Sequence, residues 1–255
     1  DISTAPLVDK RKEKDLYQRL IKYDLIFSPQ KKSNIMFHKF LNKYNKKKSL
    51  INIPVIHEVG YPKLDYLRRK KIRRNLKKKI IVIAPTDYRH VQKLSIYNEL
   101  DNIIDLILKK TSYIIYFRPY PANLKSKKIL RLIRKYSNIK RFNLDNSNDY
   151  TNVYLKSRYL LTDISGTAFT YAYFTNRKVI FYSRNEKLVK EIFYTDNSYF
   201  KDRNRFGVIK SKPIEIVNFM NNDNSNYSSK KIKNDIKYLD NSKQRIKFLL
   251  KKYLN

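Results

Sequence analysis

Four short polar segments of this sequence carry the side chains that could do chemistry. They are residues 60–65 (GYPKLD), 84–90 (APTDYRH), 117–121 (FRPYP) and 160–168 (LLTDISGTA). Most of them follow apolar, β-branched runs, a pattern typical of buried strands that lead into loops. Their arginines, hydroxyls and helix-start amides are the groups that bind phosphate in proteins. The segments therefore predict a phosphate site assembled from several loops.

The segment 160–168 is the most informative of the four. A strand ends at Asp163, and Ser165, Gly166 and Thr167 then open a helix. Small residues leave backbone N–H groups accessible at the positive end of a helix, where a phosphate or diphosphate binds. Two hydroxyls add donors, the glycine admits a ligand close to the backbone, and Asp163 would orient the loop or a ribose hydroxyl. An ordinary Ser or Thr N-cap is the alternative interpretation.

The other segments offer further candidates. Thr86 and Arg89 could hold a phosphate, and His90 could donate a proton or a hydrogen bond, although a plain helix-capping loop has the same pattern. Arg118 and Tyr120 stand on a loop made rigid by two prolines. Residues 60–65 predict a tight turn after a strand, in which Asp65 could anchor the helix that follows. The alternative is a plain turn that links two lobes.

The predicted catalytic residues are Arg118, Tyr120 and His90. A general base is not evident: His90 is the best histidine candidate, and a residue that precedes Asp1 is favoured over it. No clustered metal ligands are visible, so no metal site is predicted.

From residue 80 onward, strand-like runs alternate with helical patterns, which predicts a parallel α/β sheet covered on both faces. We expect strands at 80–85, 113–117, 140–144, 158–162 and 179–182, and helices at 95–108, 124–136, 150–157, 166–174, 214–220 and 232–254. A fainter copy of this rhythm places strands at 24–27 and 52–56 around a helix at 33–41. Ligands of such sheets bind at the carboxyl ends of the strands, where the polar segments lie.

The chain is predicted to have four parts. Residues 1–62 are the tail of an N-terminal α/β lobe that we expect to be incomplete in this chain, and residues 63–79 are a basic linker helix. Residues 80–225 form a C-terminal Rossmann-like lobe, and residues 226–255 a terminal basic helix.

Composition excludes several classes of protein. Without cysteine there is no disulfide, iron–sulfur cluster or Cys-ligated zinc. With three glycines the chain has neither a G-x-G-x-x-G fingerprint nor a Walker A loop. No run of 18 apolar residues predicts a membrane span. Lys and Arg number 57 against 22 Asp and Glu, a formal charge of +35, to which the codon bias of an AT-rich genome also contributes.

Nine of the twelve residues at 68–79 are cationic. The residues predicted to contact a membrane or polyanion are Arg68, Arg69, Lys70, Lys71, Arg73 and Arg74. An anionic membrane surface is favoured, while a polyanionic acceptor chain or a solvated linker helix is the alternative. Nucleic acid is not expected, because the sequence has no RNP1 or KH signature.

Taken together and in this order, the segments resemble the CDP-glycerol glycerophosphotransferase family, which polymerises teichoic-acid-like and capsular chains. The family's Gly-Tyr-Pro-basic-x-Asp turn is matched by residues 60–65, and its Ala-Pro-Thr segment with a following Arg by residues 84–89. Its Arg-Pro-His-Pro loop is matched by residues 118–121 with Tyr120 in place of His, its Asp-Tyr-Ser-Ser stretch by 163–166, and its Lys-Pro-x-x-Phe-Tyr strand by 178–182. The match covers roughly residues 24–182.

The resemblance implies a GT-B-like pair of Rossmann-type lobes, with the nucleotide held mainly by the C-terminal lobe. It implies a transferase that moves a glycerol-phosphate or related unit from a CDP-type donor to a growing surface polymer. In that reaction Arg118, assisted by Arg89, would neutralise charge that grows on the leaving nucleotide. The donor would be a substrate, with no further cofactor. The partners would be an anionic polymer or lipid-linked acceptor and the inner face of the cell membrane, where the cytoplasmic enzyme would be peripheral.

Two alternatives remain open at this point. A GT-B glycosyltransferase with a CMP- or UDP-linked donor would share these segments, and so would a basic, non-catalytic module that binds polymer or nucleic acid. The family's other histidine stretch has its counterpart at residues 3–7, which contain no histidine.

Overall fold

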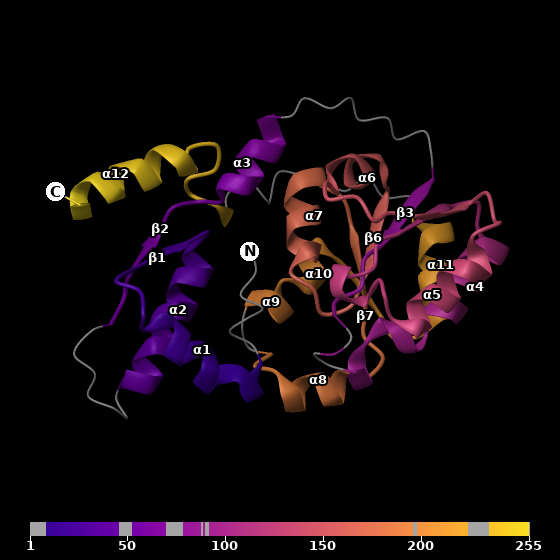
Figure 1. Cartoon of the computed structure of the whole chain (residues 1–255), viewed down its shortest axis with the longest axis horizontal. Helices are drawn as coiled ribbons and strands as arrows, with labels where there is room; N and C mark the ends of the chain where they lie inside the picture. Colours follow the sequence, from indigo (N-terminus) through magenta and orange to yellow (C-terminus); the bar gives the residue numbers. More distant parts are fainter. Residues whose placement is uncertain are drawn as a thin grey trace. The chain divides into compact units, whose positions relative to one another are not determined.

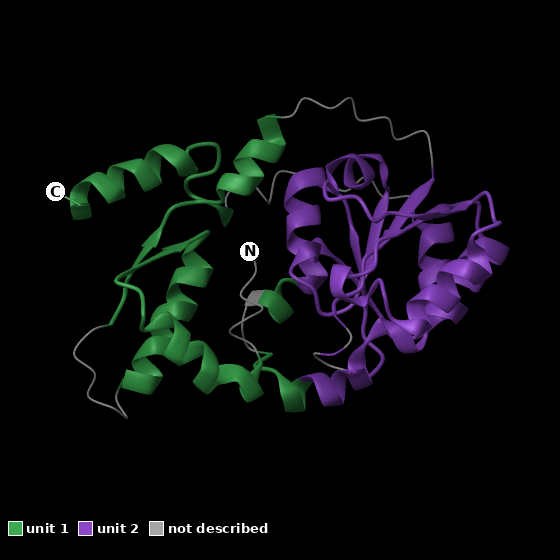
Figure 2. Ribbon diagram, viewed as in Figure 1, with its two compact units in different colours: residues 1–71, 190–202, 228–255 green, residues 72–189, 203–227 purple. Residues whose placement is uncertain are grey.

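The structure is a computed structural model that describes residues 9–45, 53–69, 79–87, 89, 92–195, 198–223 and 235–254 (Figure 1). The chain forms two compact units (Figure 2). Unit 1 consists of residues 1–71, 190–202 and 228–255, and unit 2 of residues 72–189 and 203–227. The terminal segment that the sequence set apart at 226–255 therefore contributes residues 228–255 to unit 1.

Unit 2 is built around a six-stranded sheet in which all neighbouring strands are parallel. Its strands are β3 (Ile80–Ile83), β4 (Ile114–Phe117), β5 (Phe142–Leu144), β6 (Tyr159–Thr162), β7 (Val179–Tyr182) and β8 (Gly207–Lys210). The spatial order is β5-β4-β3-β6-β7-β8. Counted from β3, this is the 3-2-1-4-5-6 order of a Rossmann fold. The predicted parallel α/β sheet is confirmed.

Helices cover both faces of this sheet (Figure 1). The helical segments of unit 2 are η3 (Gln92–Leu94), η4 (Ile96–Asn98), α4 (Leu100–Lys110), η5 (Pro121–Asn123), α5 (Lys127–Tyr136), α6 (Thr151–Lys156), α7 (Thr167–Thr175), α10 (Arg203–Phe206) and α11 (Pro213–Asn222). The helix α8 (Glu186–Ile192) begins in unit 2 and ends in unit 1. One face packs against α4, α5 and α11, which share a hydrophobic core with the strands. On the other face, α7 is buried from its second residue to its last, as expected of a helix that is apolar all round.

Two local features explain how these elements form. The helix α4 presents apolar residues three and four positions apart, such as Leu100, Ile103 and Ile107, and all of them are buried. The strand β8 begins at Gly207, where a Cβ atom would lie 1.7 Å from the carbonyl oxygen of Val179 on β7. Only glycine therefore permits this pairing of β7 and β8.

Unit 1 contains a two-stranded parallel sheet and several helices. They are η2 (Lys10–Lys12), α1 (Glu13–Leu20), β1 (Leu25–Ser28), α2 (Lys31–Asn45), β2 (Val55–Glu58), α3 (Pro62–Arg69), α9 (Ser198–Lys201) and α12 (Ser242–Leu254). A small core from α1, α2 and β2 holds it together. Asp65, predicted to anchor the helix after residues 60–65, accepts hydrogen bonds from the backbone N–H groups of Asp240 and Ser242 at 2.7 and 3.0 Å. It thereby fixes the start of α12.

Among the described helices, none combines the length and the apolar character that a bilayer crossing requires. The described residues likewise contain no group of three or more acidic or histidine side chains placed to hold a metal ion.

Candidate functional site

The candidate site lies where the strand order of unit 2 reverses direction. The strands β3 and β6 are neighbours in the sheet although two strands separate them in sequence. Ligands of doubly wound sheets bind at the carboxyl ends of strands at this kind of reversal. The loops that leave β3 and β6 here are two of the predicted segments, and the backbone N–H of Thr86 donates to Oδ1 of Asp163 at 2.9 Å. The fold thus joins these two segments directly.

Asp163, in the loop after β6, binds the loop after β3 and the start of η4. Its side chain is buried, at 3% exposure, and its Oδ2 accepts a hydrogen bond from the backbone N–H of Ile96, at the start of η4, at 3.2 Å. Burial raises the pKa of Asp163 to about 6, against the opposing effect of the backbone N–H groups of Thr86 and Ile96. Because both carboxylate oxygens accept bonds from protein amides, this geometry favours the loop-orienting role over a ribose contact.

The start of α7 carries the predicted phosphate ligands. Ser165, Gly166 and Thr167 are half-buried, so this end of the helix is accessible, and Gly166 is the N-cap residue. The backbone N–H of Thr167 donates to Oγ of Ser165 at 3.4 Å. The hydroxyl of Thr167 also lies 2.6 Å from the hydroxyl of Tyr154. The N-cap residue is thus a glycine without a side-chain capping bond, and the alternative of an ordinary Ser or Thr N-cap is not what the structure shows.

Arg118 is held by groups that the sequence analysis did not identify. Its Nη1 donates to Oδ2 of Asp145 at 2.7 Å, and its Nη2 donates to the carbonyl oxygen of Ser147 at 2.8 Å. Its guanidinium also lies over the ring of Tyr150, 5.7 Å from the centroid. The side chain of Arg118 is 18% exposed and that of Asp145 only 6%. The loop after β5 therefore orients the cation at the end of β4.

A pair of tyrosines on and beside α6 connects Arg118 to α7. The rings of Tyr150 and Tyr154 lie 4.7 Å apart, and Tyr154 contacts Thr167 through its hydroxyl. Burial raises the pKa of Tyr154 to about 12, while the hydrogen bond with Thr167 and the charge of Arg118 lower it. The contacts from Arg118 to Tyr150, from Tyr150 to Tyr154 and from Tyr154 to Thr167 therefore connect Arg118 to the start of α7.

The remaining predicted residues lie in different surroundings. The side chain of Tyr120 is 42% exposed, and its backbone N–H donates to the hydroxyl of Tyr97 at 3.4 Å. The guanidinium of Arg89 donates to both carboxylate oxygens of its near neighbour Asp87, at 2.6 Å for the shortest contact. His90 lies outside the described residues.

The basic cluster is only partly described. Arg68 donates to both carboxylate oxygens of Asp240, at 3.1 and 3.3 Å, and Arg69 donates to the backbone carbonyl of the same residue at 3.4 Å. These two cations therefore stabilise the packing of α3 within unit 1. The other predicted members lie outside the described residues, namely Lys70, Lys71, Arg73 and Arg74.

Asp145 and Ser147 could have been noticed in the sequence. They follow an expected strand in an acidic and polar run, DNSND at 145–149, at the same sheet edge as the other candidates. What the sequence could not show is their partner, because Arg118 lies 27 positions away from Asp145.

Comparisons with solved structures agree with this fold. The wall teichoic acid polymerase TagF, in a crystal soaked with CDPG, is 25% identical to this chain with a TM-score of 0.60, over 95% of this chain and 61% of TagF. The UDP-GlcNAc 2-epimerase of Methanocaldococcus jannaschii, in complex with UDP-GlcNAc and UDP, is 15% identical with a TM-score of 0.58, over 89% of this chain and 60% of the epimerase. The MnaA–UDP structure from S. aureus is 18% identical with a TM-score of 0.55, over 91% of this chain and 60% of MnaA. The two latter likenesses concern the fold alone, which is GT-B-like.

The chain thus spans less than two thirds of the length of these solved structures. No curated protein matches its sequence. The model of one protein family, described as CDP-glycerol:poly(glycerophosphate) glycerophosphotransferase, matches residues 1–241. That range contains every segment on which the resemblance was based, and we conclude that the chain belongs to the CDP-glycerol:poly(glycerophosphate) glycerophosphotransferase family.

Proposed function

We propose that unit 2 is the donor-binding lobe of a transferase that moves glycerol phosphate from CDP-glycerol to a growing cell-surface polymer. The observation that carries this proposal is the bond between Thr86 and Asp163 at the reversal of the strand order. It joins two loops at the place where a Rossmann sheet binds nucleotides. Family membership and the likeness to TagF support CDP-glycerol as the donor.

In this proposal the start of α7 binds the donor phosphates. The N-terminus of a helix carries roughly half a positive charge, and its amides point toward an anion. Ser165 and Thr167 add hydroxyl donors at that end, and Gly166 leaves room for the diphosphate beside the backbone. Asp163 and Thr86 act as positioning residues, because their bond holds the loop after β3 against the loop that leads into α7.

The reaction then requires little covalent chemistry from the protein. A hydroxyl of the acceptor attacks the phosphorus that carries the glycerol, the bond from that phosphorus to the bridging oxygen breaks, and CMP leaves. Negative charge grows on CMP, and Arg118 is placed to stabilise it. Because Asp145 and Ser147 already orient the guanidinium, little ordering is needed on binding. The proton of the acceptor hydroxyl passes to a base, for which His90 stays the candidate.

We test the phosphate site with a hydroxyl-removing double variant, Ser165→Ala with Thr167→Ala. Isothermal calorimetry with CDP-glycerol should show a loss of roughly 1.5–3 kcal/mol for each hydrogen bond to the charged phosphates. Thr167→Ser is the matched control, because it keeps the hydroxyl and should bind the donor nearly as well as the wild type. Ser137→Ala, at the far end of α5, controls for the loss of a surface hydroxyl.

Two results would overturn the assignment. If the double variant and the wild type bind CDP-glycerol with equal affinity, the donor phosphates do not bind at the start of α7. Tighter binding of UDP-GlcNAc than of CDP-glycerol by the wild type would instead point to a sugar-nucleotide donor.

The same proposal places the protein in the cytoplasm, peripheral on the inner face of the membrane, where the acceptor polymer grows. Since Arg68 and Arg69 already contact Asp240, the attraction to anionic lipid depends on the rest of the cluster, for which each cation near the surface contributes about 1 kcal/mol. Lys70→Gln with Lys71→Gln should weaken co-sedimentation with anionic vesicles and leave neutral vesicles unaffected. Unaltered sedimentation with anionic vesicles would contradict the membrane contact.

A further inference from the structure

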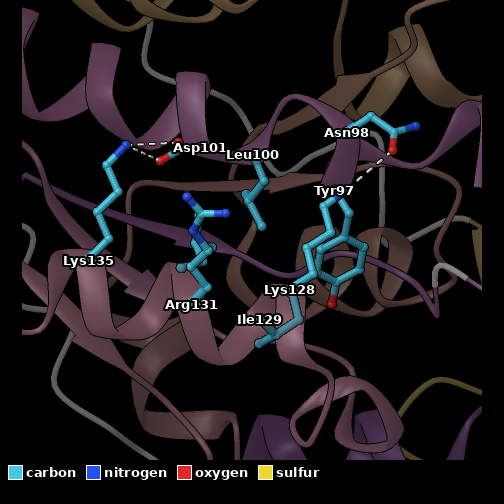
Figure 3. Close-up of a pocket in the computed structure, with 9 residues that line it drawn as sticks. Tyr97, Asn98, Leu100, Asp101, Lys128, Ile129, Arg131 and Lys135 are labelled. Atoms are coloured by element: carbon cyan, nitrogen blue, oxygen red, sulfur yellow. Dashed lines mark hydrogen bonds and ion pairs between the residues drawn. The ribbon is translucent and has the colours of Figure 1, made fainter.

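A cavity of about 440 Å³ lies between α4 and α5 in unit 2 (Figure 3). Tyr97, Leu100 and Ile129 contribute buried apolar surface to its lining. The donor-phosphate site proposed above uses none of the residues around this cavity. Its lining therefore raises the separate question of what it binds.

Three cations line the cavity along α5. Lys128, Arg131 and Lys135 are three and four positions apart, so they lie on one stripe of the helix. Figure 3 shows Arg131 and Lys135 extending from α5 toward α4. From Lys128 to Lys135 the stripe rises by seven positions, or about 10 Å of helix at 1.5 Å per residue. A chain with negative charges at regular intervals fits such a stripe.

The three cations share one carboxylate of the cavity lining, that of Asp101. Lys135 forms an ion pair with Asp101 at 2.7 Å. Lys128 contacts the neutral side-chain oxygen of Asn98 at 3.4 Å. Arg131 makes no hydrogen bond within the described part of the chain, but, against the effect of burial, its charge together with that of Lys135 lowers the pKa of Asp101. The lining thus carries a net charge of +2, from three cations and the carboxylate of Asp101, beside buried apolar residues.

The cavity is fastened to the loop that carries Arg118. The hydroxyl of Tyr97 in its wall accepts hydrogen bonds from the backbone N–H of Tyr120 at 3.4 Å and from the side chain of Asn123 at 3.5 Å. The preceding residue, Ile96, is bonded to Asp163. The wall of the cavity is therefore joined by hydrogen bonds to both loops of the proposed transfer site.

We propose that this cavity is an acceptor subsite that binds a phosphodiester unit of the growing polyanionic chain. The inference rests on the proposed function, because it deepens the account of that reaction by placing its acceptor. A polyol-phosphate chain alternates charged phosphates with short carbon segments, which matches alternating cations above apolar residues. The family description names poly(glycerophosphate), a chain of this chemistry. Binding a phosphodiester here would hold the polymer next to Arg118 between successive transfers.

The test measures binding of a fluorescent synthetic glycerol-phosphate oligomer to the full chain by anisotropy. Lys128→Gln with Arg131→Gln should weaken this affinity by about tenfold and lower its dependence on salt. Lys127→Gln with Arg134→Gln is the matched control, since it removes the same charge from exposed positions of the same helix outside the cavity. This control should change the affinity less than about threefold. Arg131→Lys, which keeps the charge, should retain most of the binding.

Several outcomes would overturn the subsite. Equal weakening by the two double variants would mean general attraction between a basic protein and a polyanion. If inorganic phosphate competes as effectively as unlabelled oligomer, the cavity is a simple anion site. If the wild type binds no oligomer, the acceptor subsite is refuted. Calorimetry with CDP-glycerol separates this test from the proposed function. Donor affinity should be equal in wild type and cavity variant, whereas a wild type that binds oligomer but no CDP-glycerol would refute the donor site and leave a polyanion site.

Discussion

The loops after β5 and β6 each place a buried aspartate at the carboxyl edge of the sheet, but the two are bound differently. Asp145, 7% exposed, accepts hydrogen bonds from the guanidinium of Arg118 and the hydroxyl of Ser147. Asp163, 3% exposed, accepts bonds from the backbone N–H groups of Thr86 and Ile96. One carboxylate thus faces a full positive charge, and the other is bound by backbone N–H dipoles.

This difference separates two tasks that a transfer site requires. A buried ion pair costs desolvation, yet once formed it holds both partners in a fixed orientation. Asp145 can therefore keep Arg118 ready for a ligand. Backbone amides compensate a buried charge less fully, which is why burial still raises the pKa of Asp163 to about 6. Asp163 therefore holds the loops in position at some expense of stability.

We expect the largest effect from Arg118→Lys, which removes the guanidinium that Asp145 and Ser147 orient. Lysine keeps the charge but cannot contact Asp145 and Ser147 with the planar fork of a guanidinium. We expect the turnover number with CDP-glycerol to fall by about 10²-fold, near 2.7 kcal/mol in activation free energy, with a smaller loss of donor affinity. Steady-state kinetics and calorimetry together measure the two effects.

Asp145→Asn serves as the companion variant, because it keeps Arg118 but removes the negative charge of the residue that orients the guanidinium. If Asp145 acts by orientation, turnover should fall while the protein still binds the donor. Equal losses of turnover and affinity in Arg118→Lys would reduce Arg118 to a binding residue. A wild type that turns over no CDP-, CMP- or UDP-linked donor would favour the non-catalytic binding module.

Much of the fold of unit 2 could be predicted from local pattern. The strand 179–182 was predicted with the bounds that the structure has, because its four apolar residues are all buried and directly precede a loop. The short strand β8 was missed, since each of its four residues is only half-buried and its periodicity is correspondingly weak. Its pairing depends on the close approach of Gly207 to β7, a tertiary constraint that sequence periodicity does not contain.

The candidate site shows the same limit. Residues 163–167 could be selected because a strand end followed by small polar residues has a local signature. The partners of Arg118 and of Asp163 come from other loops, 27 and 77 positions away for Asp145 and Thr86. Only the strand order brings these loops together, and the order was not evident before the structure.

A smaller effect is expected on the pH dependence of the free energy of unfolding, because the pKa of Asp163 is raised in the folded protein. Between the ordinary value of 3.8 and the folded value of about 6, the folded protein binds a proton that the unfolded chain does not. The free energy of unfolding therefore decreases as pH rises through this window, and this group adds stability toward acid. Between pH 7 and pH 4.5 its contribution should grow by roughly 2 kcal/mol.

Asp163→Asn isolates this contribution, because asparagine does not titrate and keeps one oxygen acceptor for Thr86 or Ile96. Urea unfolding of both proteins should show that the free energy of unfolding of the wild type, relative to that of the variant, is roughly 2 kcal/mol higher at pH 4.5 than at pH 7. Other carboxylates, such as Asp101, whose pKa is lowered by Lys135 and Tyr136 despite partial burial, titrate in both proteins and cancel in the difference. A difference that is the same at both pH values would mean that Asp163 is already well compensated in the folded protein. The contrast with Asp145 would then not depend on charge, and the two loops would differ only in which groups their aspartates hold.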